Sequence, residues 1–153
     1  MTLQTQGLLA GRGDTPLGDS CPIDRTLQLL GNRVSLLLLR ETFYGATRFE
    51  QLWRRVGVTE ATAAQRLREL VDGGVLERRP YRSPGTRTRQ EYVLTPAGHD
   101  LMPVILGMFD WGAHHIGRDG SPTATHASCG AEVRSVPRCS QGHDVTESDI
   151  VIS

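Results

Sequence analysis

The hydrophobic period of the chain changes at the Gly73-Gly74 pair, and this change limits the folds that the sequence can adopt. Before the pair, apolar residues recur at helical spacing, at Ala63, Leu67, Leu70 and Val71. After the pair, Val75 to Tyr81 and Gln90 to Leu94 are typical of short strands, and Ser83-Pro84-Gly85 between them indicates a loop. The sequence therefore predicts a helix that leads directly into a β-hairpin.

Three more helices are predicted before this one. The first is short, with its apolar residues at Ile23, Leu27 and Leu30 and a break at Gly31-Asn32. The second contains the run Leu36 to Leu39 and stops at Gly45, and its leucine content favours a buried, central position. The third has one apolar face, formed by Phe49, Leu52 and Val56, and ends in a turn at Gly57. Thr59 then suits the N-cap of the helix that precedes the hairpin.

A last helix is expected after the hairpin. Thr95 caps it, Pro96 occupies its first position, and its apolar face continues without a break to Ile116. Residues 1–20 contain several glycines without a sustained period, and the residues after Gly117 are rich in Gly, Pro, Ser and Thr. We therefore predict a flexible arm (1–20), one folded domain (21–117) and a C-terminal tail (118–153).

Charge is distributed unevenly along the chain, although its 17 basic and 17 acidic residues cancel. Between Arg48 and Leu94 there are ten arginines and six acidic residues, a local excess of four positive charges. Every basic residue is arginine, whose planar guanidinium suits phosphates and guanine edges, although coding bias explains the same composition. The sequence therefore predicts a basic middle between neutral and acidic ends.

Neither export nor membrane insertion is indicated. The first twenty residues lack a basic start followed by a long apolar stretch, and the run Leu36 to Leu39 is far too short to span a bilayer. Three cysteines, an odd number, fit reduced thiols better than a disulfide framework. We therefore expect a cytoplasmic protein that makes no contact with a membrane.

Two short helices joined through Gly57, followed by a basic hairpin, have the order of a winged helix-turn-helix. We predict a mainly α fold with a small β-hairpin wing (77–92), in which helix 59–72 reads the major groove of double-stranded DNA. A solvated face is the alternative for any single arginine, but their convergence on one helix and one wing favours DNA. The expected DNA-binding residues are Arg48, Thr59, Thr62, Gln65 and Arg66 on the helices, and Arg82, Arg87 and Arg89 on the wing.

An ordered series of motifs between residues 21 and 116 resembles the HxlR-type regulators, which are relatives of the MarR group. The matching segments are Cys21-Pro22-Ile23, Gly31-Asn32-Arg33, Arg48-Phe49-Glu50-Gln51-Leu52, Gln65-Arg66-Leu67-Arg68-Glu69-Leu70, Gly74-Val75-Leu76-Glu77-Arg78 and Tyr92-Val93-Leu94-Thr95-Pro96-Ala97-Gly98. The resemblance implies a repressor that forms a homodimer through its terminal helices and binds a pseudo-palindromic operator. The chain departs from the family at Asn32-Arg33-Val34, where a Lys-Trp pair is common, and in the small residues Ala61 to Ala64, so the base preference stays open.

Cys21 precedes the first predicted helix, where several members of the resembled family sense oxidants or electrophiles. A thiol near a helix N-terminus reacts more readily as a thiolate, which would make Cys21 a redox sensor. A small, inert residue at the dimer contact is an equal alternative. The sequence leaves both open, together with the possibility of a small-molecule effector.

The tail carries four residues with metal-ligand chemistry: His126, Cys129, Cys139 and His143. Their spacing resembles two degenerate zinc knuckles, in which Gln141 and Gly142 stand where a further thiol is expected. A disordered or loosely packed tail without zinc is favoured over this arrangement. His114 and His115, with Asp110 one turn earlier, are interpreted as solvated residues near a helix C-terminus rather than as metal ligands or an acid-base pair.

Two other classes of function are alternatives to DNA binding. A winged helix that binds a protein partner would use its apolar helix faces and Trp53 or Trp111, and the arginines of the wing argue against it. An enzyme would need Cys21 or the tail residues to act with a positioned base, and the sequence contains no phosphate-cradling loop, nucleophile elbow or His-Glu-x2-His motif. We therefore predict a DNA-binding regulator that is not an enzyme.

Overall fold

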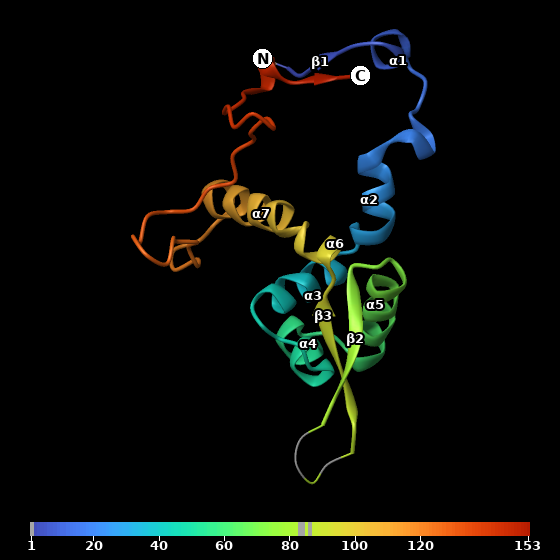
Figure 1. The fold of residues 1–153 in the computed structure, drawn as a ribbon, viewed down its shortest axis with the longest axis vertical. Coiled ribbons are helices and arrows are strands. Elements are labelled where there is room, and N and C mark those ends of the chain that lie inside the picture. Colours follow the sequence, from blue (N-terminus) through green and yellow to red (C-terminus); the bar gives the residue numbers. More distant parts are fainter. Residues whose placement is uncertain (1, 83–84, 86) are drawn as a thin grey trace. The chain divides into compact units, whose positions relative to one another are not determined.

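A computed structural model describes residues 2–82, 85 and 87–153 of the chain (Figure 1). The contacts divide the chain into two compact units, which are described separately. One contains residues 21–105, and the other joins the residues up to 20 with residues 106–153. Within the described residues, no helix combines the length and the apolar composition that crossing a membrane would require.

The unit of residues 21–105 is mainly helical and carries one small antiparallel sheet. Its elements follow one another as α2 (Pro22–Leu30), α3 (Arg33–Phe43), α4 (Phe49–Val56), α5 (Glu60–Asp72), β2 (Leu76–Tyr81), β3 (Arg89–Leu94) and α6 (Pro96–His99), before the start of α7 (Met102–His115). The two strands pair from Leu76 opposite Leu94 to Tyr81 opposite Arg89. The predicted mainly α fold with a β-hairpin wing is confirmed. Ser83 and Pro84 of the predicted loop lie outside the described residues.

Side-chain caps and glycines set the limits of these helices. The Thr59 hydroxyl accepts a hydrogen bond from the Thr62 amide at 3.2 Å, and the Thr95 hydroxyl accepts one from the Gly98 amide at 3.0 Å, as predicted for two N-caps. At the end of α4, Gly57 adopts φ 74° and ψ 40°, a left-handed conformation that residues with a Cβ rarely adopt. Gly57 therefore permits the sharp turn between α4 and α5.

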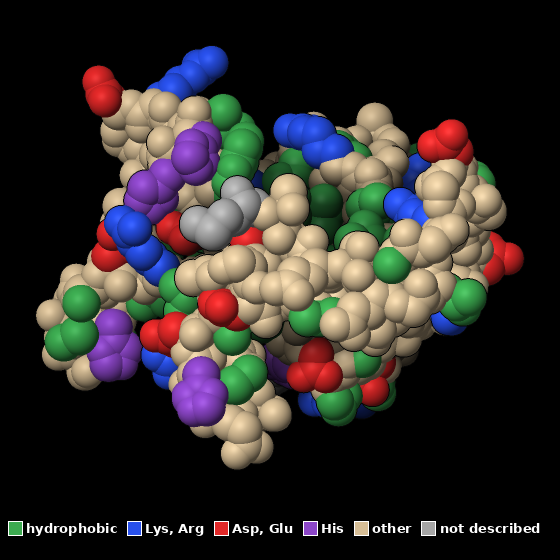
Figure 2. All heavy atoms as spheres, turned by 90° about the horizontal axis from the view of Figure 1, so that it is seen from above, with side chains coloured by type: hydrophobic (Ala, Val, Ile, Leu, Met, Phe, Trp, Pro, Cys, Tyr) green, Lys and Arg blue, Asp and Glu red, His purple; other side chains and the backbone are tan. Residues whose placement is uncertain are grey.

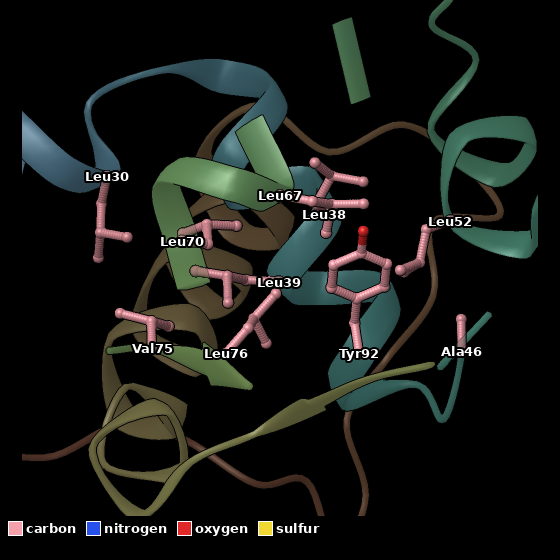
Figure 3. Packing of buried hydrophobic residues seen from close by; sticks show 10 residues of the cluster. All are labelled: Leu30, Leu38, Leu39, Ala46, Leu52, Leu67, Leu70, Val75, Leu76 and Tyr92. Carbon is pink, nitrogen blue, oxygen red and sulfur yellow. The ribbon is translucent and has the colours of Figure 1, made fainter. Parts of the chain in front are cut away.

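The core of this unit is centred on α3. Leu38 and Leu39 are fully buried, which confirms the buried helix predicted from the leucine run. The other buried hydrophobic residues of the cluster come from α2, α4, α5, the sheet and the segments that join α3 to α4 and α5 to β2. Figure 3 shows these residues around α3: Leu30, Ala46, Leu52, Leu67, Leu70, Val75, Leu76 and Tyr92. The burial of these side chains holds α4 and α5 on the same scaffold as the hairpin.

The prediction of one unbroken helix from Pro96 to Ile116 was wrong, because α6 ends at His99 and α7 begins at Met102. Gly98 lies so close to the Val75 carbonyl oxygen that a Cβ there would collide with it, and the Thr95 hydroxyl donates to the Gly74 carbonyl at 2.6 Å. These contacts fasten α6 to the end of α5 and the start of β2. Pro103 lacks an amide hydrogen and is tolerated in the first turn of a helix, so it suits the restart at α7.

The unit formed by residues 2–20 and 106–153 contains mostly short elements. Near its ends, β1 (Gln4–Thr5) pairs in parallel with β4 (Val151–Ile152). A single-turn helix, α1 (Leu8–Gly11), two short 3-10 helices and the greater part of α7 belong to the same unit. The proposed limits of the arm and the tail, at residues 20 and 117, stay a prediction.

Charged side chains of both signs are interspersed on the face of the molecule shown in Figure 2. Hydrophobic side chains lie among them, and no large area of this face carries a single sign of charge. This distribution agrees with the formal net charge of zero. Any electrostatic attraction for an anionic partner must therefore arise from a local group of arginines rather than from the charge of the whole chain.

Candidate nucleic-acid interface

Helices α4 and α5 form the helix-turn-helix predicted around Gly57. One side of α5 is buried, because Ala63, Leu67 and Leu70 are fully covered and the helix contacts α3, α4 and β2. The opposite side faces outward, and it is the side that carries the predicted reading residues. Thr62 and Gln65 are exposed, and the side chain of Arg66 is 33% exposed. The helix thus offers a polar surface of a size that fits the major groove.

A hydrogen-bond network joins the polar residues of this outward side. The Glu69 carboxylate accepts a bond from Gln65 Nε2 at 2.8 Å and another from Arg66 Nη1 at 2.6 Å. Arg68 Nη2 donates to Gln65 Oε1 at 2.6 Å. The hydrogen bond from Gln65, followed by the one from Arg66, holds the pKa of the Glu69 carboxyl below its ordinary value, because both favour the ionised form.

Sequence reasoning missed Glu69 and Arg68 as partners of the reading residues. The spacing carried the information, because residues three and four apart lie side by side on a helix. Glu69 stands four residues after Gln65 and three after Arg66. Thr59 was predicted to bind DNA, but its hydroxyl already caps α5 and lies 2.9 Å from the hydroxyl of Thr62.

The wing places its arginines on exposed positions. Arg89 begins β3, and Arg82 and Arg87 lie between the strands; all three side chains are exposed. Toward the base of the hairpin, the guanidinium of Arg78 lies 5.8 Å from the centre of the Tyr92 ring, and Arg79 forms an ion pair with Glu77 at 2.6 Å. The described part of the wing is therefore richest in exposed positive charge toward its tip.

A hollow of about 330 Å³ lies between the wing and the first turns of α4 and α5. Its lining includes Arg48 and Trp53 near α4, Glu60 at the start of α5, and Tyr81, Arg89 and Gln90 from the wing. The structure thus brings together Arg48 and Arg89, two of the predicted DNA-binding residues that are distant in sequence. It also shows that the start of α5 and the wing share one side of this unit.

The segment before α4 is attached to the wing through the backbone. The Tyr92 amide donates to the Thr47 carbonyl at 2.7 Å, and the Thr47 hydroxyl donates to Glu91 at 3.1 Å. Arg48 forms an isolated β-bridge with Glu91, and its guanidinium lies 5.0 Å from the centre of the Tyr81 ring. These contacts fix the position of α4 and its N-cap relative to β3.

The remaining arginines of α4 are paired with acidic side chains. Arg54 forms an ion pair with Glu50 at 2.7 Å, one turn away on the surface of the helix. Arg55 Nη1 lies 3.8 Å from the buried carboxylate of Glu41, which also pairs with Arg40 at 2.7 Å. The second contact joins α4 to α3, so Arg55 supports the scaffold.

Cys21 is the N-cap residue of α2. Its sulfur lies 3.5 Å from the Asp24 amide, which donates to it, and Pro22 occupies the first helical position. The side chain is half-buried, and the cysteine is free. The redox-sensing candidate thus has its sulfur at the start of a helix.

The four tail residues with metal-ligand chemistry form two separate pairs. His126 Nδ1 lies 3.1 Å from the Cys129 sulfur, and His143 Nδ1 lies 3.6 Å from the Cys139 sulfur. Within the described ranges, the one group of three or more potential ligands that converge consists of other residues, namely Asp110, His114 and Glu132. The structure therefore does not bring the two tail pairs together into one four-ligand site.

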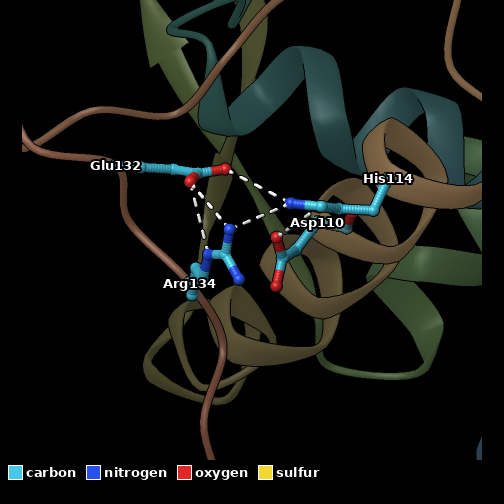
Figure 4. Close-up of polar contacts among 4 residues, drawn as sticks. All are labelled: Asp110, His114, Glu132 and Arg134. Atoms are coloured by element: carbon cyan, nitrogen blue, oxygen red, sulfur yellow. Dashed lines mark hydrogen bonds and ion pairs between the residues drawn. The ribbon is translucent and has the colours of Figure 1, made fainter.

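Asp110, His114 and Glu132 form a polar cluster that includes Arg134 (Figure 4). His114 Nδ1 lies 2.8 Å from the Asp110 carbonyl oxygen and 3.1 Å from the Asp110 carboxylate. Arg134 Nη2 lies 3.2 Å from His114 Nε2 and 3.0 Å from the Glu132 carboxylate. The Arg134 guanidinium thus already supplies positive charge to the Glu132 carboxylate. His114 is exposed, as predicted, and it also links α7 to the segment around residues 132–134.

Comparison with known proteins places these features in a family. Residues 29–120 match the model of the HxlR-like helix-turn-helix family. The chain is 37% identical over 131 residues to the uncharacterised HTH-type transcriptional regulator Rv3095 of Mycobacterium tuberculosis, a match that covers 84% of this chain and 82% of that protein.

Solved structures share the fold. The crystal structure of PA1607 is similar with a TM-score of 0.77 and 28% identity, over 90% of this chain and 96% of that one. The redox regulator HypR in its reduced form is similar with a TM-score of 0.55 and 28% identity, over 63% of this chain and 96% of that one. The family match covers more than half of the chain, including the whole helix-turn-helix and wing. The chain belongs to the HxlR-like helix-turn-helix family.

Proposed function

We propose that this chain regulates transcription by binding double-stranded DNA, with α5 in the major groove and the wing on the adjacent backbone or minor groove. The observation that carries the proposal is the shared side of α5 and the wing. The hollow between them is lined by Glu60 from the first turn of α5 and by Arg89 from the wing. A duplex placed against the first turn of α5 would therefore also lie near Arg48 and Arg89.

Sequence is read by the side chains on the outward surface of α5. Gln65 pairs with adenine and Arg66 with guanine, each through two hydrogen bonds, and Thr62 contacts a base edge near the start of the helix. Such a pair distinguishes the right base from a wrong one by about 1–3 kcal/mol. Arg48 and the exposed arginines Arg82, Arg87 and Arg89 hold phosphates or enter the minor groove.

The regulator acts as a homodimer formed by its terminal helices. Apolar side chains on α2 and α7 support this assembly, because Ile23 is 71%, Leu27 55% and Trp111 59% exposed. Large apolar side chains left exposed on a helix are typical of a surface that a partner covers. A twofold dimer places two reading helices on a pseudo-palindromic operator, with half-sites about one helical turn apart.

In this proposal the protein is cytoplasmic, represses transcription and has no enzymatic activity. A dimer bound at an operator blocks transcription by occupying the DNA, and this role requires no catalytic group. The relatives named above, which include an HTH-type transcriptional regulator and a redox regulator, support a regulatory role. A protein-interaction module that does not bind DNA specifically is the alternative, and the concentration of exposed arginines on the wing argues against it.

Binding to selected and to random duplexes, measured over a range of salt concentrations, tests the proposal. The affinity should fall steeply as salt rises, because arginines displace counterions from phosphates. Arg66→Ala should weaken binding to a selected sequence more than to random DNA. Arg118→Ala, the same change outside the helix-turn-helix and the wing, serves as the control. Equal losses in the two variants, or no salt dependence, would favour the protein-interaction alternative.

Redox control through Cys21 is a second candidate function. Its half-buried sulfur accepts a hydrogen bond from the Asp24 amide at the start of α2. Hydrogen peroxide would oxidise the thiol to a sulfenic acid with release of water, and a sulfenic acid at the end of a dimer helix would alter the packing there. We expect Cys21→Ser to abolish release from DNA by peroxide, whereas Cys129→Ser and Cys139→Ser leave it intact. Unchanged release from the Cys21 variant would exclude the sensor.

A further inference from the structure

The Glu69 carboxylate contacts two of the three proposed reading residues, Gln65 and Arg66. Its two carboxylate oxygens are used separately, with Oε1 accepting from Gln65 at 2.8 Å and Oε2 accepting from Arg66 at 2.6 Å. The side chain is 35% exposed, so it lies on the surface that a duplex would approach. An acidic residue at this place repels phosphates, and its presence on a DNA-reading surface therefore requires an explanation.

The network fixes the orientation of the Gln65 amide. Nε2 faces a carboxylate, and Oε1 accepts from the guanidinium of Arg68 at 2.6 Å. The opposite orientation would place the amide oxygen against a carboxylate and the amide nitrogen against a guanidinium, and both contacts are repulsive. One of the two orientations of the amide is therefore strongly preferred before any DNA is bound.

The same network leaves the reading residues able to bind bases. A glutamine amide has two N–H donors and an oxygen that accepts two hydrogen bonds, so Gln65 keeps one donor and one acceptor after its bonds to Glu69 and Arg68. Adenine requires one donor and one acceptor from glutamine. Arg66 has five N–H donors, of which the bond to Glu69 uses one. The contacts to Glu69 thus orient both residues without exhausting their hydrogen-bonding capacity.

We infer that Glu69 is a positioning residue for sequence recognition, which holds the Gln65 amide and the Arg66 guanidinium in the orientation that their target bases require. This inference rests on the proposed function. Glu69 positions the two side chains through contacts made in the free protein. The two flexible side chains are therefore ordered before DNA binds rather than during binding. The negative charge of Glu69 opposes binding to any duplex, and positioning favours only the matching sequence.

A test compares the base preferences of the full-length wild type and the Glu69→Gln variant, using duplexes selected from a random-sequence library. We expect the variant to lose about tenfold in discrimination at the positions that Gln65→Ala and Arg66→Ala also affect. Its affinity for random duplexes should be unchanged or higher. Its salt dependence should be unchanged, since no phosphate contact is removed. Asp72→Asn makes the same change of charge one turn later on α5 and serves as the matched control.

Each outcome separates the possible roles of Glu69. If Glu69→Gln and Asp72→Asn strengthen binding to all duplexes alike and leave base preferences intact, Glu69 acts through its charge alone and the inference is overturned. If Gln65→Ala and Arg66→Ala leave the wild-type preferences unchanged, the proposed reading surface itself is wrong. The Gln65 side-chain amide resonances in the free protein provide a measurement that needs no DNA. An absence of change in these resonances in Glu69→Gln would also overturn the inference.

Discussion

Glu69 shows how strongly a single exposed residue can be shaped by its neighbours on a helix. Two donors converge on one carboxylate because residues three and four apart share a side of the helix, and both donors are residues proposed to read DNA. The hydrogen bonds favour the ionised carboxylate and therefore lower its pKa. As pH falls, Glu69 should keep its charge to a lower pH than an ordinary exposed glutamate, and its contacts should be lost only below that range.

Replacing Gln65 should reverse much of this shift in the free protein. The hydrogen bond from Gln65 is the largest cause of the lowered pKa, and that from Arg66 is the next. We therefore expect Gln65→Ala to raise the pKa of the Glu69 carboxyl toward its ordinary value. Carbon-detected NMR titration of the glutamate carboxyls measures this directly, with Glu147 as a reference residue in the same samples. A pKa that does not move would show that the contact is absent in solution.

At the scale of elements, the sequence predicted the helices, the wing and the caps because each depends on local chemistry. The left-handed turn needs a glycine at Gly57, and the caps need hydroxyls at Thr59 and Thr95. The break between α6 and α7 was missed because it depends on a tertiary contact, the approach of Gly98 to the carbonyl of Val75. Pro103 was the local indication of that break, since a helix unbroken from Pro96 would lose a backbone hydrogen bond there.

For the candidate interface too, the sequence predicted the features that depend on local pattern and missed those that depend on tertiary contacts. Periodicity identified the outward side of α5, and composition identified the arginines of the wing. The meeting of Arg48 with Arg89 in one hollow could not be inferred, because it depends on the pairing of the segment before α4 with β3. The Glu69 network was available from spacing alone, but it becomes specific only when the donor and acceptor atoms are known.

The contact between α6 and the start of the wing yields a prediction about stability. Gly98→Ala should destabilise the domain by about 1–3 kcal/mol, because the new Cβ meets backbone, which cannot move aside as a flexible side chain would. Urea unfolding followed by circular dichroism measures the change in the free energy of unfolding. Gly11→Ala provides the control, because its Cβ would meet nothing within 4 Å and its φ is not positive. Equal stability of the two variants would contradict the contact described here.

At the scale of the whole molecule, the proposed function depends on assembly. One copy of α5 reads only a few base pairs, and the specificity of a winged-helix regulator depends on two copies held at a fixed spacing. In the proposed dimer, the exposed apolar side chains of α2 and α7 connect DNA binding to oligomeric state. A change on α2, far from α5 in the sequence, should therefore reduce operator binding without altering any residue that touches DNA.

Ile23→Asp isolates this effect. Ile23 is 71% exposed in the single chain and stands in the first turn of α2, where an acidic side chain interacts favourably with the helix dipole. The variant should therefore fold as the wild type does, but burying a carboxylate at a dimer contact is unfavourable, so analytical ultracentrifugation should find a monomer. Its affinity for a two-half-site operator should fall by about 100-fold or more. A monomer bound at one half-site does not carry a second reading helix to the other half-site, so the gain from bivalent binding is lost. Binding to a single half-site should be nearly unchanged. Leu8→Asp removes an apolar side chain of similar size that is 92% exposed and lies in α1, outside the proposed dimer helices α2 and α7, and it should leave both properties intact. A dimeric Ile23→Asp variant with full operator affinity would place the dimer contact elsewhere on the chain.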